Sequence, residues 1–146
     1  MSNEFRRVQT GIAGFDQLVE GGIPEKSFSL LTGPAGAGKS IFGMNFLVHG
    51  ALKGDNGIYV AFENVEETVR DMKLFWPFIE DLINQRKITI FQPDLYNFDA
   101  LLTAIEDSIE RTKSARLVID PVSIIETYFT EPFKVRKNFL KLVNSA

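Results

Sequence analysis

The octapeptide GPAGAGKS, residues 33–40, contains residue types that could bind phosphate. Gly33, Gly38, Lys39 and Ser40 fit the pattern G-x-x-x-x-G-K-[ST]. Glycines let successive backbone N–H groups turn inward around an anion, and a following helix directs the positive end of its dipole at the same point. The lysine would reach the outer phosphates, and the serine hydroxyl would coordinate Mg²⁺. We therefore expect a nucleotide phosphate site formed by the whole loop: Gly33, Pro34, Ala35, Gly36, Ala37, Gly38, Lys39 and Ser40.

A magnesium ion held by such a loop also needs a carboxylate across the site, usually at the end of an apolar strand. The run RLVID ends in Asp120, which is our candidate for binding Mg²⁺ through water. Taken alone, an aspartate after a strand is better interpreted as a cap or turn residue. The upstream loop favours the metal role. Pro121 ends the strand and places the carboxylate at the carboxyl edge, where open parallel sheets bind ligands.

Hydrolysis further requires a base or an orienting group for the attacking water. Glu63 follows the apolar run GIYVAF and is the candidate catalytic residue, because it would leave the same sheet edge as Asp120. Glu66 and Glu67 lie just beyond it. Their simpler interpretation is as acidic residues in the first turn of a helix, where they are favourable to its dipole.

The elements that must position these residues alternate along the chain. Short apolar runs predict strands at 27–31, 57–62, 88–91 and 116–120. Amphipathic or apolar patterns predict helices at 39–53, from Val65 to Met72, after Asn97 as far as Ile109, and at 131–144. This order predicts an α/β fold with a mainly parallel sheet, right-handed crossovers and helices on both faces. We expect a single domain over residues 1–146.

The helix predicted at 39–53 is apolar around nearly its whole circumference, so it is expected to be buried on most sides. His49 lies within it and is the only histidine. We interpret it as a hydrogen-bonded histidine inside or at the edge of the core, with no role in chemistry.

Composition excludes several classes of function. The 146 residues contain no cysteine, which excludes disulfides and thiolate metal sites. The net charge of −3 argues against a surface built mainly to bind nucleic acid. A DNA-binding alternative draws on four basic residues near the C-terminus, which are more simply interpreted as a solvated helix face: Lys134, Arg136, Lys137 and Lys141. No signal peptide or run of about 18 apolar residues occurs, so we expect a cytoplasmic protein with no membrane partner.

Three stretches together resemble the KaiC-like branch of the RecA/RadA ATPases: TGIAGFDQLVEGGIPEKSFSLLTGPAGAGKS, GIYVAFEN and RLVIDPVS. The resemblance runs from about Thr10 to about Ser123 and implies a RecA-like P-loop core that binds ATP or ADP with Mg²⁺. It also implies that Lys39 and Ser40 bind phosphate and Mg²⁺, that Asp120 is the magnesium-side aspartate, and that Glu63 is the catalytic glutamate. The resemblance further implies a homo-oligomer, since members of this family assemble into rings. The chain has no N-K-x-D motif, which favours adenine over guanine.

The sequence departs from the family pattern in two ways. Asn64 stands where the family commonly has a second carboxylate. Family domains also continue past the aspartate with a strand that lies between the phosphate-loop strand and the aspartate strand. We therefore expect a domain incomplete at its C-terminus, either a fragment or a partial domain completed by another chain. The expected function is a slow Mg²⁺-dependent ATPase acting as regulator or motor in an oligomer; the alternative is an ATP-binding switch without hydrolysis.

Overall fold

The computed structural model describes residues 6–94, 97–124, 137 and 140–141. Its elements, in chain order, are β1 (Arg7–Val8), α1 (Phe15–Leu18), β2 (Ile23–Pro24), α2 (Lys39–Lys53), β3 (Gly57–Ala61), α3 (Val65–Lys73), α4 (Ile79–Asn84), β4 (Ile88–Phe91), α5 (Phe98–Thr112) and β5 (Arg116–Asp120). The helix expected at 131–144 lies outside the described residues except at 137, 140 and 141.

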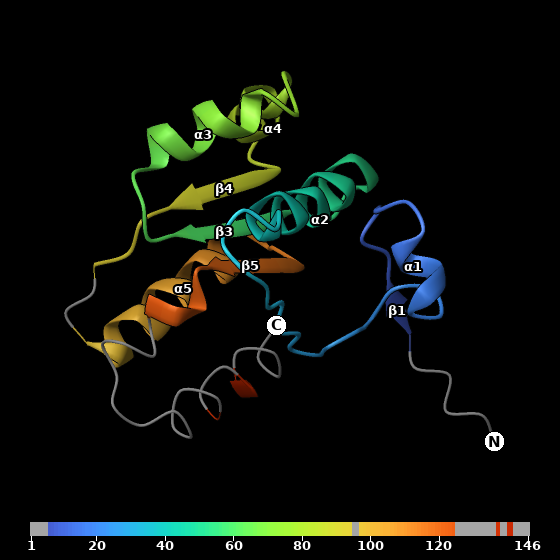
Figure 1. Cartoon of the computed structure of the whole chain (residues 1–146). Helices are drawn as coiled ribbons and strands as arrows, with labels where there is room; N and C mark the ends of the chain where they lie inside the picture. The colour runs from blue at the N-terminus through green and yellow to red at the C-terminus, as the bar shows by residue number, and fades with distance from the viewer. Residues whose placement is uncertain (1–5, 95–96, 125–136, 138–139, 142–146) are drawn as a thin grey trace.

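The main sheet has β3 at its centre, in the order β4-β3-β5, and both pairs are parallel (Figure 1). Gly57 at the start of β3 is level with Ile88 and Arg116, and Ala61 at its end is level with Asp120. The chain passes through helices between these strands. The α/β fold with a parallel sheet is therefore confirmed, and the carboxyl ends of β3 and β5 lie at one edge.

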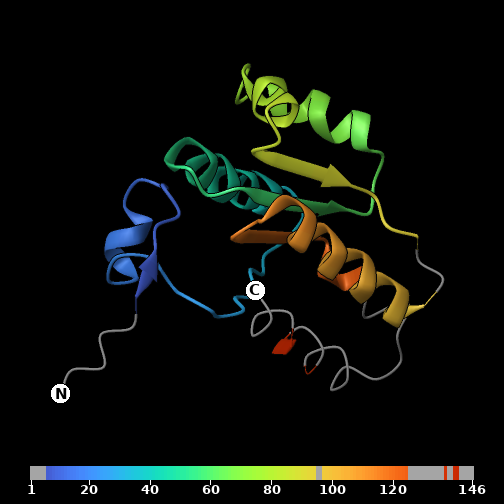
Figure 2. The ribbon, with the colours of Figure 1, turned by 180° about the vertical axis from the view of Figure 1, so that it is seen from behind.

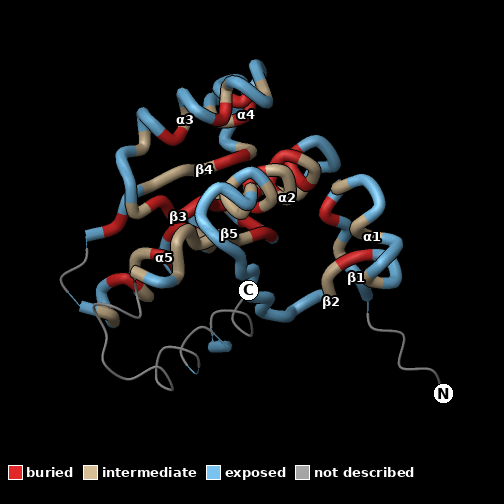
Figure 3. The backbone as a smooth tube through the Cα atoms, in the orientation of Figure 1, coloured by how far each residue is buried: buried red, intermediate tan, exposed pale blue. Residues whose placement is uncertain are grey.

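Helices cover both faces of this sheet. One core joins α2, α3 and α4 to residues such as Tyr59 and Ala61 of β3, and the other joins α5 to Ile58 and Val60. Successive side chains of a strand point to opposite faces, so a continuous apolar run serves both layers. Figure 2 shows α5 on the side of the sheet opposite α2, and Figure 3 shows the buried residues concentrated along β3 and the inner sides of the helices.

The strand predicted at 27–31 does not form. Residues 27–34 have no regular secondary structure, and Phe28, Leu30 and Leu31 are 38%, 63% and 45% exposed. A strand requires a neighbour with which its backbone groups can pair. The expected sheet places another strand between this segment and β5, and no segment of the described residues occupies that place. The segment leading to the phosphate loop consequently lies outside the sheet.

Helix α2 has the predicted bounds, but its burial differs from the prediction. Met44 and Leu47 are fully buried, whereas Ile41 and Leu52 are 36% and 63% exposed. The helix packs closely on the sheet at Gly43, where an added Cβ would lie 2.9 Å from Val118 Cγ1. The expectation of burial on most sides is therefore wrong at two of its apolar positions.

A small N-terminal unit of β1, α1 and β2 packs beside α2 (Figure 1). The buried Arg116 of β5 secures it, since its Nη1 donates to Gln9 O at 2.8 Å and to Phe46 O at 2.9 Å. The Arg116 guanidinium also lies over the Phe46 ring and pairs with Asp55 at 3.2 Å. One side chain thus joins the sheet, α2 and the N-terminal segment.

His49 lies where this unit meets α2. An added Cβ on Gly11 would come within 2.3 Å of His49 Nδ1, so the two segments touch there. Its Nε2 is buried and has no hydrogen-bond partner among the described residues. Burial lowers the pKa of His49, and the charges of Lys53 and Arg116 lower it further. The position at the edge of the core agrees with the prediction, but the expected hydrogen bond at Nε2 is not made.

Candidate phosphate and magnesium site

The phosphate loop enters α2 through two residues in the left-handed region. Gly36 has φ 78° and Gly38 has φ 92°, and an added Cβ would meet no atom within 4 Å at either position. Backbone conformation, not lack of space, therefore favours glycine at these two positions. Gly38 caps α2 without a side-chain hydrogen bond. The first N–H groups of α2 have no partner within the helix and point towards the loop, together with the positive end of the dipole.

Lys39 curls back over the loop. Its Nζ donates to Gly33 O at 2.6 Å and to Pro34 O at 2.9 Å. A shallow hollow at this place is lined by Gly36, Gly38, Lys39, Ser40 and Ile41. A cation, helix N–H groups and a hydroxyl therefore surround one concave surface, which is the donor set that a phosphate requires.

Ser40 and Asp120 meet at the sheet edge although 80 residues separate them in sequence. Ser40 Oγ donates to Asp120 Oδ2 at 2.5 Å. The register of β5 against β3 brings Asp120 to this edge, and the start of α2 brings Ser40. A hydroxyl and a carboxylate are the hard oxygen ligands that Mg²⁺ takes together with phosphate oxygens and water. The residues present fit the predicted ion.

Tyr59 joins this pair and is absent from the residues that the sequence predicts for the site. Its hydroxyl donates to Asp120 Oδ2, the same oxygen that Ser40 contacts. Burial raises the pKa of Tyr59 well above its ordinary value, and the bond to Asp120 raises it further. Strand alternation is the signal that could have found it: Tyr59 and Ala61 share a face of β3, and Ala61 is level with Asp120.

Glu63 lies two residues beyond β3 and is exposed. The ladder continues past the strand, since Phe62 N donates to Asp120 O at 3.3 Å. The negative charge of Glu63 also contributes to the raised pKa of Tyr59, after burial and the bond to Asp120. The structure thus brings Glu63 to the same sheet edge as Asp120 and Ser40.

Asn64, which stands where the family commonly has a second carboxylate, is the N-cap residue of α3. Its side chain caps α3 and accepts a hydrogen bond from Glu67 N at 3.2 Å. Glu66 and Glu67 occupy the first turn of α3, as predicted. Asparagine is among the preferred residues at this helix position. The substitution that distinguishes this chain from the family pattern therefore begins a helix.

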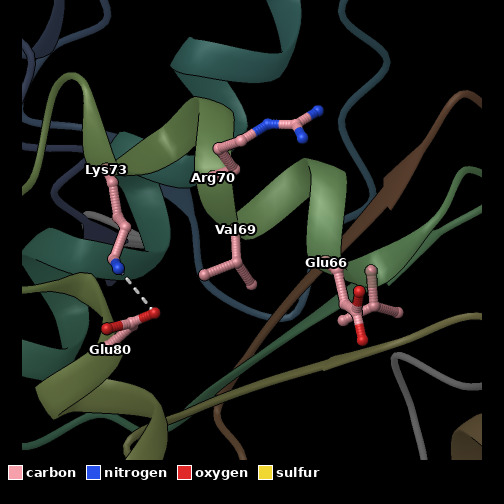
Figure 4. A pocket seen from close by; sticks show the side chains of 6 residues that line it. Glu66, Val69, Arg70, Lys73 and Glu80 are labelled. Atoms are coloured by element: carbon pink, nitrogen blue, oxygen red, sulfur yellow. Dashed lines mark ion pairs between the residues drawn. The ribbon is translucent and has the colours of Figure 1, made fainter.

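A second hollow lies between α3 and α4, as Figure 4 shows. It is lined mainly by α3 residues, and Lys73 Nζ pairs with Glu80 Oε1 across it at 2.6 Å. Both side chains are about half exposed, so the pair contributes little to stability. None of its lining residues belongs to the phosphate loop. In the described part of the chain, no group of three or more histidines or carboxylates could hold a metal.

Comparison with known proteins decides the family. A family model described as "ATPase: KaiC" matches residues 8–145. The chain belongs to the KaiC ATPase family. The predicted resemblance is confirmed, and the family places the chain among the P-loop ATPase domains.

Individual KaiC relatives agree. The chain is 31% identical over 151 residues to circadian clock protein KaiC3 of Synechocystis, a match that covers 95% of the chain and 30% of that protein. It is 30% identical over 152 residues to circadian clock oscillator protein KaiC of Prochlorococcus marinus, covering 96% of the chain and 30% of that protein. The chain thus spans about 30% of the length of these two relatives.

A solved KaiC-like structure from the archaeon Pyrococcus horikoshii matches with a TM-score of 0.82 and 37% identity. The match covers 94% of this chain and 63% of that one. The RecA-type fold expected from the sequence is confirmed by this match. Among residues 6–94, 97–124, 137 and 140–141, no helix has the length and apolar character needed to cross a bilayer.

Proposed function

We propose that this chain binds ATP with Mg²⁺ at residues 33–40 and hydrolyses it slowly. The observation that carries the proposal is the hydrogen bond from Ser40 Oγ to Asp120 Oδ2, which joins the phosphate loop to the carboxyl end of β5. Membership of the KaiC ATPase family supports the same reaction class. The contact matters because the two residues come from separate elements and supply the oxygen ligands that a nucleotide-bound Mg²⁺ needs.

The loop, its lysine and serine, and Asp120 have separate roles in this proposal. The N–H groups at the start of α2 would bind the phosphate oxygens, and Lys39 would exchange its bonds to Gly33 O and Pro34 O for the outer phosphates. Ser40 would bind the metal directly, and Asp120 would bind one of its waters. When bound, Mg²⁺ would neutralise the charge that develops on the phosphates.

Glu63 is proposed to orient or deprotonate the attacking water. Its position just beyond β3, at the edge that holds Asp120, supports this role. The alternative is an ATP-binding switch without hydrolysis. Asn64 favours that alternative, because it stands where the family commonly has a second carboxylate and its side chain caps α3 instead. Glu63 is then the one carboxylate of this pair.

Partners are also part of the proposal. The exposed apolar side chains of Phe28, Leu30 and Leu31 support assembly with copies of this chain or with a chain that completes the sheet. DNA binding has weaker support. Lys137 and Lys141 are exposed, whereas Lys134 and Arg136 lie outside the described residues. A cytoplasmic location and a role as regulator or motor remain predictions.

The decisive experiment measures phosphate release from ATP and Mg²⁺ by the wild-type chain and by Glu63→Gln. The ATPase proposal expects turnover by the wild type and a loss of at least about 100-fold in the variant, the size of a general-base contribution. ATP binding with identical, background turnover in both proteins would leave only the switch.

A further inference from the structure

We propose that Tyr59 is a positioning residue for magnesium binding: it holds the Asp120 carboxylate by one oxygen so that the other faces the metal's water. The inference rests on the proposed binding of ATP with Mg²⁺. It assigns a role to a buried tyrosine that is neither part of the phosphate loop nor one of the proposed carboxylates.

The geometry begins with the strands. Tyr59 is level with Val118 on β5, and Ala61 is level with Asp120. Tyr59 and Ala61 pack in the same core layer as α2, and Val118 packs against that layer. Because side chains alternate along a strand, Asp120 leaves β5 on the face of Val118. A tyrosine is long enough to cross this diagonal, and its hydroxyl reaches the carboxylate two residues further along the neighbouring strand.

The contacts distinguish the two oxygens of Asp120. Oδ2 accepts from both the Ser40 and the Tyr59 hydroxyls, whereas no described residue donates to Oδ1. Two donors that arrive from α2 and β3 fix the rotation of the carboxylate. A hydroxyl that donates to a carboxylate keeps its lone pairs for a cation. Ser40 can therefore hold Asp120 and bind Mg²⁺ together, and both of these bonds leave Oδ1 for the proposed contact with a metal-bound water.

Tyr59 is well suited to this task because it cannot move far. Its side chain is 2% exposed and packs in the core beside Met44 and Leu47 of α2. A buried phenol requires a hydrogen-bond partner, and Asp120 supplies it. The rigid β3 strand thus sets the orientation of a carboxylate that lies at the last position of β5.

The test compares Tyr59→Phe with the wild type in two titrations. The first titration measures binding of a fluorescent ATP analogue in EDTA. The second titrates MgCl₂ into the nucleotide complex in buffer without EDTA. A parallel experiment replaces Mg²⁺ by Mn²⁺ and measures metal binding by electron paramagnetic resonance. Loss of one bond to a carboxylate should raise the Mg²⁺ concentration at half-saturation roughly tenfold. Nucleotide affinity in EDTA should change less than about twofold, because Tyr59 meets the site only at Ser40 and Asp120, the proposed magnesium ligands, and does not line the hollow beside Lys39.

The matched control is Met44→Leu, which alters the same core cluster and makes no bond to Asp120. Metal binding weakened in Tyr59→Phe but not in Met44→Leu would support the proposal. Unchanged metal binding in Tyr59→Phe, or an equal loss in both variants, would overturn it. A wild-type chain that binds no ATP at all would instead reject the proposed function.

If Tyr59→Phe does not fold, the wild-type hydroxyl can be observed directly. Incorporation of 3-fluorotyrosine into a Tyr96→Phe, Tyr128→Phe chain leaves a single ¹⁹F resonance at Tyr59. The resonance should shift when Mg²⁺ is added to the ATP complex. A resonance that responds to ATP in EDTA and not to Mg²⁺ would contradict the positioning role.

Discussion

Replacement of Lys39 by alanine should weaken ATP binding roughly 10- to 100-fold, because a charge-assisted hydrogen bond contributes about 1.5 to 3 kcal/mol. In the structure the Lys39 ammonium donates to Gly33 O and Pro34 O, both on the exposed loop. Water can replace those two bonds at little cost, so their loss should hardly offset the value of the phosphate contact. The expected change in affinity therefore stays near the full value of the charged contact.

The assay is a titration of the chain with a fluorescent ATP analogue at fixed Mg²⁺ and ionic strength. Lys53→Ala is the matched control, since Lys53 ends the same helix and its Nζ donates to Gln9 Oε1 at 2.7 Å, away from the loop. Lys53→Ala should bind ATP as the wild type does. Equal affinity in the wild type and Lys39→Ala would refute the assignment of residues 33–40 as the phosphate site.

Three further predictions concern turnover, stability and pH. Glu63→Gln should retain ATP affinity within about twofold and reduce phosphate release by at least about 100-fold, and turnover equal to wild type would exclude Glu63 as the base. Arg116→Met should lower the free energy of unfolding by about 2 to 5 kcal/mol in urea, because it leaves the partly buried carbonyls of Gln9 and Phe46 without their donor. Asp55→Asn, at a carboxylate 46% exposed, should cost less than about 1 kcal/mol. The pKa of His49 is lower in the folded chain than its ordinary value of 6.5, so the unfolded chain binds this proton more readily. The free energy of unfolding should therefore fall as the pH drops below about 6.5. His49→Gln should remove this component in unfolding experiments between about pH 5 and 7, and an unchanged slope would contradict it.

Local patterns were sufficient to predict much of the fold. The bounds of α2 follow from its apolar content and its glycines, and α5 begins after Asn97, whose side chain accepts from Ala100 N at 2.7 Å. The three strands of the parallel sheet were predicted because apolar runs of that length are typical of strands buried on both faces. The strand predicted at 27–31 is wrong because strand formation depends on pairing with a neighbouring strand, and the composition of the segment itself cannot show whether that neighbour is present.

The residues of the site also divide into those that the sequence predicts and one that only the structure shows. Loop residues could be predicted because their roles depend on spacing within eight positions, and Asp120 because strand ends gather at one edge. Tyr59 could not be chosen from the sequence as easily, since a buried tyrosine in a strand is ordinarily core. Only the register of β3 against β5 shows that its hydroxyl meets the carboxylate.

The absence of the predicted strand also changes how the phosphate loop is supported. At its C-terminal end the loop continues into α2 and is tied to β5 by the Ser40 to Asp120 bond. At its start, Lys39 Nζ bonds to the carbonyls of Gly33 and Pro34, where no sheet pairing holds the described chain. Because water can replace these two exposed bonds at little cost, a phosphate that draws Lys39 away leaves the start of the loop without a strong tie. Order in residues 27–31 would then have to come from a partner strand that pairs with them, not from Lys39.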